Sequence, residues 1–285
     1  MSPTPFEIIE TLLPTIKLAG RYASNIQSKI QAQPEKSEYG DNFYATALSD
    51  ADLTIQTTIE LAMLANFPEL AFFGEEYQNS YNSKYFSTTS FPDDDQLFIT
   101  LDPIDGTRAY LDGLSNFSIV LSIIKNRRYE AIFALQPRRG HYFYALRGQG
   151  AFIADIDTPL SSAQELKLQA NNSNNIYVSF ALQNRIGEFA PEFTCWCSAI
   201  DYQRTKSVPD YLDFLAGKLG GFVIAKGNLI DSAGFAFLCK EAGAIVSNFN
   251  GEDFEPFKQV KDMRIEGIVI TPNDSIHEQI LAKLT

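Results

Sequence analysis

The chain has 285 residues, of which 45% are hydrophobic and 13% aromatic, and its formal net charge is −12. This composition excludes global disorder and allows either one large domain or two fused lobes. The acidic balance argues against a nucleic-acid backbone or an anionic membrane as the main partner. We therefore expect no nucleic-acid and no membrane partner, and an anionic substrate would need metal ions to offset the negative field.

Membrane and secretion signals are not evident in the sequence. No apolar run reaches the ~18 residues of a membrane span, and the first residues do not form a secretory signal. The three cysteines (Cys195, Cys197 and Cys239) cannot all pair with one another, and the Cys-Trp-Cys spacing is poor for a zinc site. These features predict reduced, buried thiols in a cytoplasmic protein.

Periodicity of apolar residues predicts the secondary structure. Helical spacing is expected, in chain order, over residues 6–30, 53–66, 108–114 (a turn or two), 211–216, 230–242 and 275–284. Strands are expected where β-branched and aromatic residues gather, over 70–76, 97–101, 117–124, 129–135, 141–146, 148–153, 176–180, 221–225, 244–247 and 268–271. The middle strands follow at short spacing and predict an antiparallel meander, after which strands and helices alternate.

The domain organisation is expected to follow these patterns. Polar residues over 155–175 place a soft boundary near 157–162. We expect an N-terminal α+β lobe, residues 1–157, and a C-terminal α/β lobe, residues 158–285, that form one functional unit. The expected fold class is a layered α+β or α/β protein with an antiparallel-rich first sheet.

The strongest candidate site is the hexapeptide Asp102-Pro-Ile-Asp-Gly-Thr107, which follows the strand at 97–101. Pro103 has no N–H and a fixed φ, so we expect the strand to stop there. Gly106 permits a tight turn, and the residues after it are expected to open a helix. Two carboxylates at a strand end, followed by exposed N–H groups, suit a hard cation together with a phosphate. An ordinary Asx turn is the alternative, but the whole hexapeptide is more specific than a bare Asp-x-x-Asp.

Other acidic residues fall at the ends of expected elements. Asp52 lies in the first turn of the second helix, after Ser49 or Asp50 as N-cap, and capping alone would explain it. Glu75 and Glu76 end the first expected strand, where a solvated surface pair is the alternative.

Taken in order, these motifs resemble the inositol monophosphatase superfamily of magnesium-dependent, lithium-sensitive phosphomonoesterases. That family has an Asp, then Gly-Glu-Glu, Asp-Pro-(Ile/Leu)-Asp-Gly-Thr, Trp-Asp-x-Ala-(Ala/Gly) and Glu-Ala-Gly-Gly. The matches here are Asp52, Gly74-Glu75-Glu76, Asp102–Thr107, Asp231-Ser-Ala-Gly234 and Glu241-Ala-Gly-Ala244. The resemblance covers about residues 6 to 284 and implies an α/β/α/β/α sandwich and a homodimer.

The resemblance also implies two or three bound Mg²⁺ ions. Glu75 and Asp102, with the Ile104 carbonyl, would hold the first ion; Asp102, Asp105 and Asp231 would hold the second, and a third would depend on Glu75. Mg²⁺ prefers oxygen ligands and keeps waters, and two ions can clamp both oxygens of an in-line displacement.

The remaining implied roles concern the nucleophile and the phosphate. Thr107 would orient or deprotonate the attacking water, with Asp52 supporting its hydroxyl and Glu75 counted among the catalytic residues. The amides of Gly106 and Thr107 would bind phosphate oxygens. Glu76 would help to fix the site.

The sequence departs from the family pattern around the substrate. Ile230 replaces the usual Trp before Asp231, and the segment 221–228 lacks the acidic residue that grips inositol hydroxyls in animal-type enzymes. Lys226 and Arg204 are candidates for binding a second phosphate or a carboxylate, with a solvated surface charge as the alternative for each. The loop at 31–42 is a further candidate source of a side chain for the site.

These features predict an enzyme that hydrolyses a small phosphate monoester with a metal-activated water. Inositol monophosphate, or a similar polyol or sugar phosphate, is the first candidate substrate. The alternatives are 3′-phosphoadenosine 5′-phosphate, fructose 1,6-bisphosphate and histidinol phosphate. A hypothesis of another class is an inactive relative that binds a phosphorylated ligand as a regulator. A degenerate site would be expected to lose a carboxylate or Thr107, and all of these are present.

Overall fold

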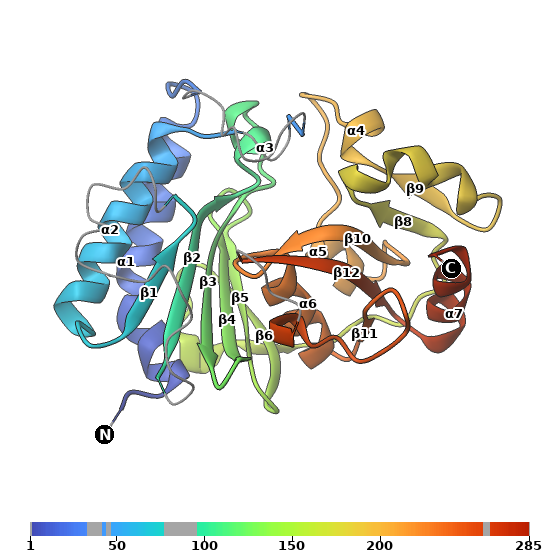
Figure 1. The fold of residues 1–285 in the computed structure, drawn as a ribbon. Coiled ribbons are helices and arrows are strands. Elements are labelled where there is room, and N and C mark those ends of the chain that lie inside the picture. The colour runs from blue at the N-terminus through green and yellow to red at the C-terminus, as the bar shows by residue number, and fades with distance from the viewer. Residues whose placement is uncertain (1, 33–41, 44–46, 77–95, 259–262, 285) are drawn as a thin grey trace. The chain divides into compact units, whose positions relative to one another are not determined.

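The structure is a computed structural model that describes residues 2–32, 42–43, 47–76, 96–258 and 263–284. The chain forms two compact units. The first contains Met1–Arg147 and Phe152–Gln164, and the second contains Gly148–Ala151 and Glu165–Thr285. Each unit is built around one β-sheet (Figure 1).

Two long helices cover one face of the sheet in the first unit (Figure 1). They are α1 (Pro5–Ile26) and α2 (Asp50–Asn66), and both begin with a capping box. In α1 the Thr4 side chain accepts from the Glu7 N–H, and in α2 Ser49 is the N-cap. A Cβ on Gly20 would stand 2.7 Å from Leu135 Cδ2, so this glycine lets α1 lie close to the sheet.

The first sheet has seven strands in the order of the sequence, β1 to β7. They are β1 (Ala71–Gly74), β2 (Phe98–Asp105), β3 (Ser118–Lys125), β4 (Arg128–Gln136), β5 (His141–Leu146), β6 (Gly150–Asp155) and β7 (Gln164–Leu166). Strand β1 is parallel to β2, whereas the pairs β2–β3, β3–β4 and β4–β5 are antiparallel. The expected antiparallel meander is therefore confirmed. A short helix, α3 (Thr107–Leu111), follows β2, and the 3₁₀ turn η4 (Leu160–Ser162) precedes β7.

The core of this unit explains why these elements form. Apolar residues at three- and four-residue spacing give α1 a buried face, and every second residue of the central strands packs against it. The helix side of this core includes Ile8, Leu12 and Ile16, and the strand side includes Leu101 and Leu121, all of them buried. Removing this apolar area from water is the main stabilising term.

The second unit has a mixed five-stranded sheet with the order β11-β12-β10-β8-β9. Its strands are β8 (Asn175–Val178), β9 (Thr194–Trp196), β10 (Gly221–Asn228), β11 (Ile245–Ser247) and β12 (Arg264–Thr271). Its helices are α4 (Ser198–Asp201), α5 (Tyr211–Leu215), α6 (Ser232–Glu241) and α7 (Asp274–Leu284), with 3₁₀ segments η5 (Phe180–Glu188) and η6 (Pro256–Lys258). Strands β9, β8 and β10 are parallel, and β12 runs antiparallel to β10 and β11.

Both faces of the second sheet are covered. Val178 and Val223 pack with Ile276 and Ile280 of α7 and with residues of η5. The alternate residues Tyr177 and Phe222 form a row of rings on the other face, whose members are Trp196, Tyr177, Phe222, Tyr211 of α5 and Phe235 of α6. The period-two alternation of apolar residues accounts for this layering.

The expected layered α/β fold is confirmed. The expected helices and strands are all present, with ends that differ by a few residues. Short elements were missed: β7, β9 and α4 each have three or four residues. The expected loop at 31–42 lies mostly outside the described residues. Among the described helices, none combines the length and apolar character needed to cross a bilayer.

Candidate metal and phosphate site

Strand β2 does not stop at Pro103, so that expectation was wrong. The strand continues to Asp105, and its register with β3 shifts between the pairs Asp102↔Val120 and Asp105↔Ser118. Three steps along β2 therefore oppose two steps along β3, which is a β-bulge. A proline is tolerated there because the ladder needs no N–H at a bulge.

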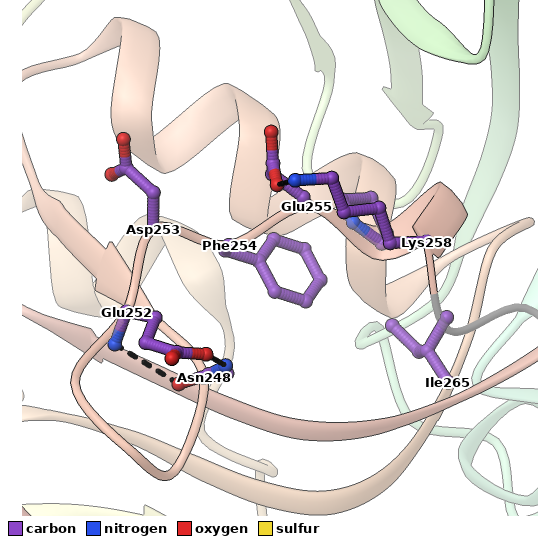
Figure 2. A pocket seen from close by; sticks show the side chains of 8 residues that line it. Asn248, Glu252, Asp253, Phe254, Glu255, Lys258 and Ile265 are labelled. Atoms are coloured by element: carbon purple, nitrogen blue, oxygen red, sulfur yellow. Dashed lines mark hydrogen bonds and ion pairs between the residues drawn. The ribbon is translucent and has the colours of Figure 1, made fainter.

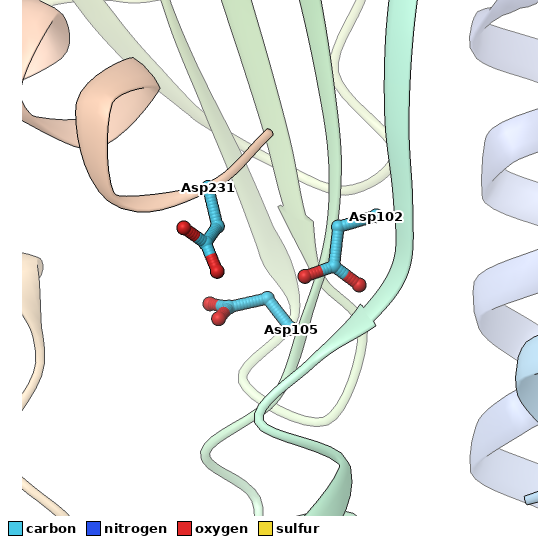
Figure 3. Close-up of side chains that lie close together, drawn as sticks. All are labelled: Asp102, Asp105 and Asp231. Carbon is cyan, nitrogen blue, oxygen red and sulfur yellow. The ribbon is translucent and has the colours of Figure 1, made fainter. Parts of the chain in front are cut away.

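The bulge places the two aspartates of the motif on one short stretch of chain (Figure 3). Asp102 is buried and Asp105 is half-buried. One carboxylate oxygen of each lies within 4.8 Å of the other, a separation that a single cation can bridge. The Ile104 N–H donates to Asp102 Oδ1 at 3.0 Å, which fixes that carboxylate against its own turn.

A left-handed glycine then turns the chain into α3. Gly106 has φ +88° and is the N-cap of the helix. A Cβ at this position would stand 2.8 Å from the Asn116 carbonyl oxygen, so both the backbone angle and the available space require glycine. The expected turn and the helix after it are confirmed.

Thr107, the first residue of α3, is buried and touches two acceptors. Its Oγ1 lies 2.9 Å from the Ile104 carbonyl oxygen and 3.2 Å from Asp52 Oδ1. Since a hydroxyl has one hydrogen and two lone pairs, a lone pair remains for a further donor whichever acceptor takes the hydrogen. The Ile104 carbonyl, expected as a metal ligand, thus also holds Thr107.

Asp52 has two functions in the structure, one on each oxygen. Oδ2 accepts from the backbone N–H and the hydroxyl of Ser49, at 2.8 and 2.6 Å, which completes the capping box of α2. Oδ1 accepts from Thr107. Burial, and next the Asp52 carboxylate, raise the pKa of Tyr110. Capping and support of Thr107 are therefore compatible.

Glu75 is brought to the same edge of the sheet. Strands β1 and β2 are parallel, with Gly74 opposite Leu101, and the Glu75 N–H donates to the Leu101 carbonyl at 2.8 Å. The backbone of Glu75 therefore lies beside that of Asp102 at the carboxyl ends of the two strands. Glu75 is half-buried and Glu76 is buried.

Sequence reasoning missed Gln56, a buried side chain of α2 whose amide oxygen accepts the Glu76 N–H at 2.9 Å. The available signal was its spacing: Gln56 follows Asp52 by four residues and therefore lies on the same side of the helix.

Asp231 belongs to the second unit. It is the N-cap of α6, at the start of the helix (Figure 3). One of its oxygens accepts from both the N–H and the hydroxyl of Ser232. The expectation that Asp231 opens this helix is confirmed. Ile230, where the family has Trp, is buried.

The two basic candidates lie on the surface of the second unit. Lys226 is an exposed residue of β10, opposite Glu266 of β12, and Arg204 is exposed in the segment between α4 and α5. Both side chains are exposed, so either could contact a bound substrate or only solvent.

The second unit also contains a pocket of about 390 Å³ (Figure 2). Its lining residues are Asn248, Glu252, Asp253, Phe254, Glu255, Pro256, Lys258 and Ile265. Glu252 and Asn248 bond to each other, and Glu255 is ion-paired with Lys258. None of the residues predicted from the sequence lines this pocket.

The three cysteines are thiols without a disulfide, as expected. Cys197 and Cys239 are buried, whereas Cys195 is half-buried, so the expectation of burial was wrong for Cys195. Burial raises the pKa of each thiol.

Each unit is a layered α/β structure, and the first carries carboxylates at the ends of its strands, which is an arrangement suited to a metal-dependent enzyme. The sequence profile of the inositol monophosphatase family matches residues 9–285, and the chain belongs to that family.

Three similar proteins illustrate the relationship. The Nus factor SuhB of Salmonella typhimurium is 27% identical over 246 residues, which are 82% of this chain and 83% of that protein. A fructose-1,6-bisphosphatase/inositol-1-monophosphatase of Thermotoga maritima is 28% identical over 192 residues, 67% and 68% of the two chains. The structure of an IMPase/NADP phosphatase complexed with NADP and Ca²⁺ superimposes with a TM-score of 0.73 at 14% identity, covering 99% of this chain and 97% of the other.

Proposed function

We propose that this protein is a Mg²⁺-dependent phosphatase that hydrolyses a small phosphate monoester, with inositol monophosphate or a similar polyol or sugar phosphate as the first substrate. The observation that carries the proposal is the arrangement in the first unit. Two aspartate carboxylates within 4.8 Å stand beside a buried threonine hydroxyl that a third aspartate holds. Family membership supports the same chemistry.

The donor set fits a divalent, oxygen-preferring cation. Asp102, Asp105, Glu75 and the Ile104 carbonyl offer only oxygen atoms, which suits Mg²⁺ rather than zinc or copper. We assign Asp231 as a further ligand, because it opens a helix at the family's motif position. Bound Mg²⁺ would offset the phosphate charge and lower the pKa of a bound water.

Thr107 is assigned to the attacking water. Its hydroxyl donates to Asp52 or to the Ile104 carbonyl and keeps a lone pair that can accept a hydrogen from the water. Asp52 Oδ1 lies 3.2 Å from the Thr107 hydroxyl oxygen. When Thr107 accepts a proton from the water, it can pass its own hydroxyl proton to this carboxylate. Orientation and proton acceptance therefore fall to these two residues.

The phosphate group is assigned to the start of α3. The first N–H groups of a helix have no acceptor within the helix, which makes them suitable donors to an anion. The amides of Gly106 and Thr107 hold this position, directly after the two aspartates. Lys226 and Arg204 remain candidates for a second phosphate or a carboxylate of the substrate.

A nucleotide such as 3′-phosphoadenosine 5′-phosphate is the second candidate substrate. The observation in its favour is the stacked pair Tyr177 and Trp196, both half-buried, with ring centroids 5.4 Å apart. Aromatic faces of this kind can stack on a base. The same row of rings continues into Phe222, which also gives the pair a role in packing.

A regulator that binds a phosphorylated ligand without turnover is the non-enzymatic candidate. Relatives named as Nus factors motivate it. The hydrogen bonds that hold Asp52, Thr107 and Asp102 support catalysis instead, since a binding function alone does not need the threonine hydroxyl.

Phosphate release from a set of four phosphate monoesters tests the proposal. Phosphate release would be measured with and without Mg²⁺ on inositol 1-phosphate, 3′-phosphoadenosine 5′-phosphate, fructose 1,6-bisphosphate and histidinol phosphate. We expect Mg²⁺-dependent release from a polyol or sugar phosphate. Binding of these ligands by the folded protein without any release would support the regulator. Light scattering of the same preparation would test the expected homodimer.

A further inference from the structure

Helix α2 carries a line of buried polar side chains. Asp52, Gln56 and Glu60 are spaced four residues apart, so they lie on one side of the helix, and their exposed fractions are 1%, 0% and 2%. Asp52 supports Thr107. A buried glutamine in the same line requires partners of its own, because an unsatisfied buried amide is costly.

Both ends of the Gln56 amide are bonded. Nε2 donates to Glu60 Oε1 at 3.0 Å, and Oε1 accepts the Glu76 backbone N–H at 2.9 Å. The carboxylate can only accept and the backbone N–H can only donate, so the orientation of the amide is determined. Gln56 therefore joins α2 to the chain directly after Glu75.

The end of β1 is shaped to receive this amide. A Cβ on Gly74 would stand 2.3 Å from the Gln56 amide carbon and oxygen, so only glycine permits the contact. The next two N–H groups are then held by two different elements: that of Glu75 by the Leu101 carbonyl of β2, and that of Glu76 by Gln56 of α2. The backbone on each side of Glu75 is fixed.

We propose that Gln56 is a positioning residue for Glu75, which holds the end of β1 so that the Glu75 carboxylate stands beside Asp102 before the metal binds. This inference rests on the proposed function, in which Glu75 and Asp102 share a cation. A ligand that is already in place loses less conformational freedom on binding, so Gln56 raises metal affinity without touching the metal.

A metal-binding measurement separates this role from a purely structural one. Mg²⁺ dissociation constants would be measured by isothermal titration calorimetry for the wild type, Gln56→Met and the exchange variant Gln56→Glu/Glu60→Gln, and melting temperatures would be measured without metal. Gln56→Met keeps the length but loses the acceptor for the Glu76 N–H. The exchange variant Gln56→Glu/Glu60→Gln keeps that acceptor oxygen and retains one amide donor in the pair.

Gln27→Met is the matched control. Gln27 is a buried glutamine of the same unit, whose Nε2 donates to the Tyr110 and Leu114 carbonyls, so its loss removes comparable bonds elsewhere. We expect Gln56→Met to raise the Mg²⁺ dissociation constant about 10- to 100-fold. The exchange variant Gln56→Glu/Glu60→Gln and Gln27→Met are expected to stay within about twofold of the wild type.

Each outcome is decisive. A folded Gln56→Met protein with wild-type Mg²⁺ affinity would overturn the inference and leave the proposed function intact. A wild-type protein that binds no Mg²⁺ would overturn both. If Gln56→Met does not fold, Gly74→Ala tests the same contact from the other side, because the added Cβ displaces the Gln56 amide; unchanged affinity in that variant would also overturn the inference.

Discussion

Thr107 and Asp52 are joined by a hydrogen bond of 3.2 Å between Oγ1 and Oδ1, although 55 residues separate them in the sequence. The bond connects the start of α3 to the first turn of α2. Asp52 is itself anchored through its other oxygen by Ser49, so the Thr107 hydroxyl meets a carboxylate whose position is already determined. This preorganised pair is the centre of the proposed chemistry.

Replacing the hydroxyl tests that pair. Thr107→Ala removes the group that orients the water, so we expect kcat to fall about 10²- to 10⁴-fold. Thr107→Ser keeps the hydroxyl and is expected to retain most of the activity. Steady-state phosphate release measures both variants, and circular dichroism checks that each is folded. Equal rates for the alanine and serine variants would contradict the role of Thr107.

Sequence reasoning located these residues because their chemistry is encoded locally. Asp102, Asp105, Gly106 and Thr107 fall within one hexapeptide, and the capping pattern around Asp52 is visible in the sequence. Burial and partners could not be read in the same way. The amide of Gln56 meets Glu76 only because β1 packs beside α2, a tertiary contact between residues 20 positions apart.

Local rules also failed where the sheet overrides them. Pro103 is a strand breaker on its own, but pairing with β3 carries β2 past it through a bulge. Strand β9, Thr194-Cys-Trp196, is too short to show an alternation of apolar and polar residues. It forms because it pairs with β8. Both errors arise because long-range pairing outweighs local preference.

Two glycines allow a matched test of the turn. Gly106 and Gly113 both have positive φ, +88° and +78°, but only at Gly106 would a Cβ meet a backbone atom. The strained φ costs about 1 kcal/mol for either alanine variant. We expect Gly106→Ala to lower the free energy of unfolding by more than Gly113→Ala, and also to impair phosphate release. Urea denaturation measures the difference, and equal losses would contradict the close approach to Asn116.

His277 is buried between two hydroxyls in the second unit. Nδ1 lies 2.8 Å from Thr271 Oγ1, and Nε2 lies 2.8 Å from Ser247 Oγ. Ser247 donates its hydrogen to the Asn248 carbonyl, so Nε2 carries the ring hydrogen. Thr271 then donates to Nδ1, which lies closer to its hydroxyl than the Asn273 carbonyl oxygen does, at 3.5 Å. A neutral imidazole satisfies this network.

The pH dependence of stability follows from that network. Burial lowers the pKa of His277, and the nearby carboxylates Asp274 and Glu278 only partly oppose it. The unfolded chain therefore binds a proton at a higher pH than the folded one. The stabilisation is complete above the unfolded pKa and is lost as the pH falls through the folded pKa.

A variant that cannot titrate provides the comparison. We expect the free energy of unfolding of the wild type to fall more steeply between pH 7 and pH 5 than that of His277→Gln, measured by urea denaturation. Parallel pH profiles for the two proteins would show that His277 does not contribute.

Lithium inhibition is expected if the second metal position exists. Li⁺ prefers oxygen ligands and would compete with Mg²⁺ for the set that includes Asp105 and Asp231. Phosphate release should therefore fall at roughly tens of millimolar LiCl, an order of magnitude set by site geometry. KCl at the same ionic strength is the control. Equal rates in the two salts would count against the second position.

The central claim is that Asp102 holds a catalytic Mg²⁺, and one measurement tests it most directly. Mg²⁺-dependent phosphate release from the best substrate would be compared for the wild type, Asp102→Asn and Asp155→Asn, an exposed aspartate of β6 that serves as the control. We predict that Asp102→Asn nearly abolishes turnover while the protein stays folded, and that Asp155→Asn behaves as the wild type. A folded Asp102→Asn protein with normal Mg²⁺-dependent turnover would contradict the account.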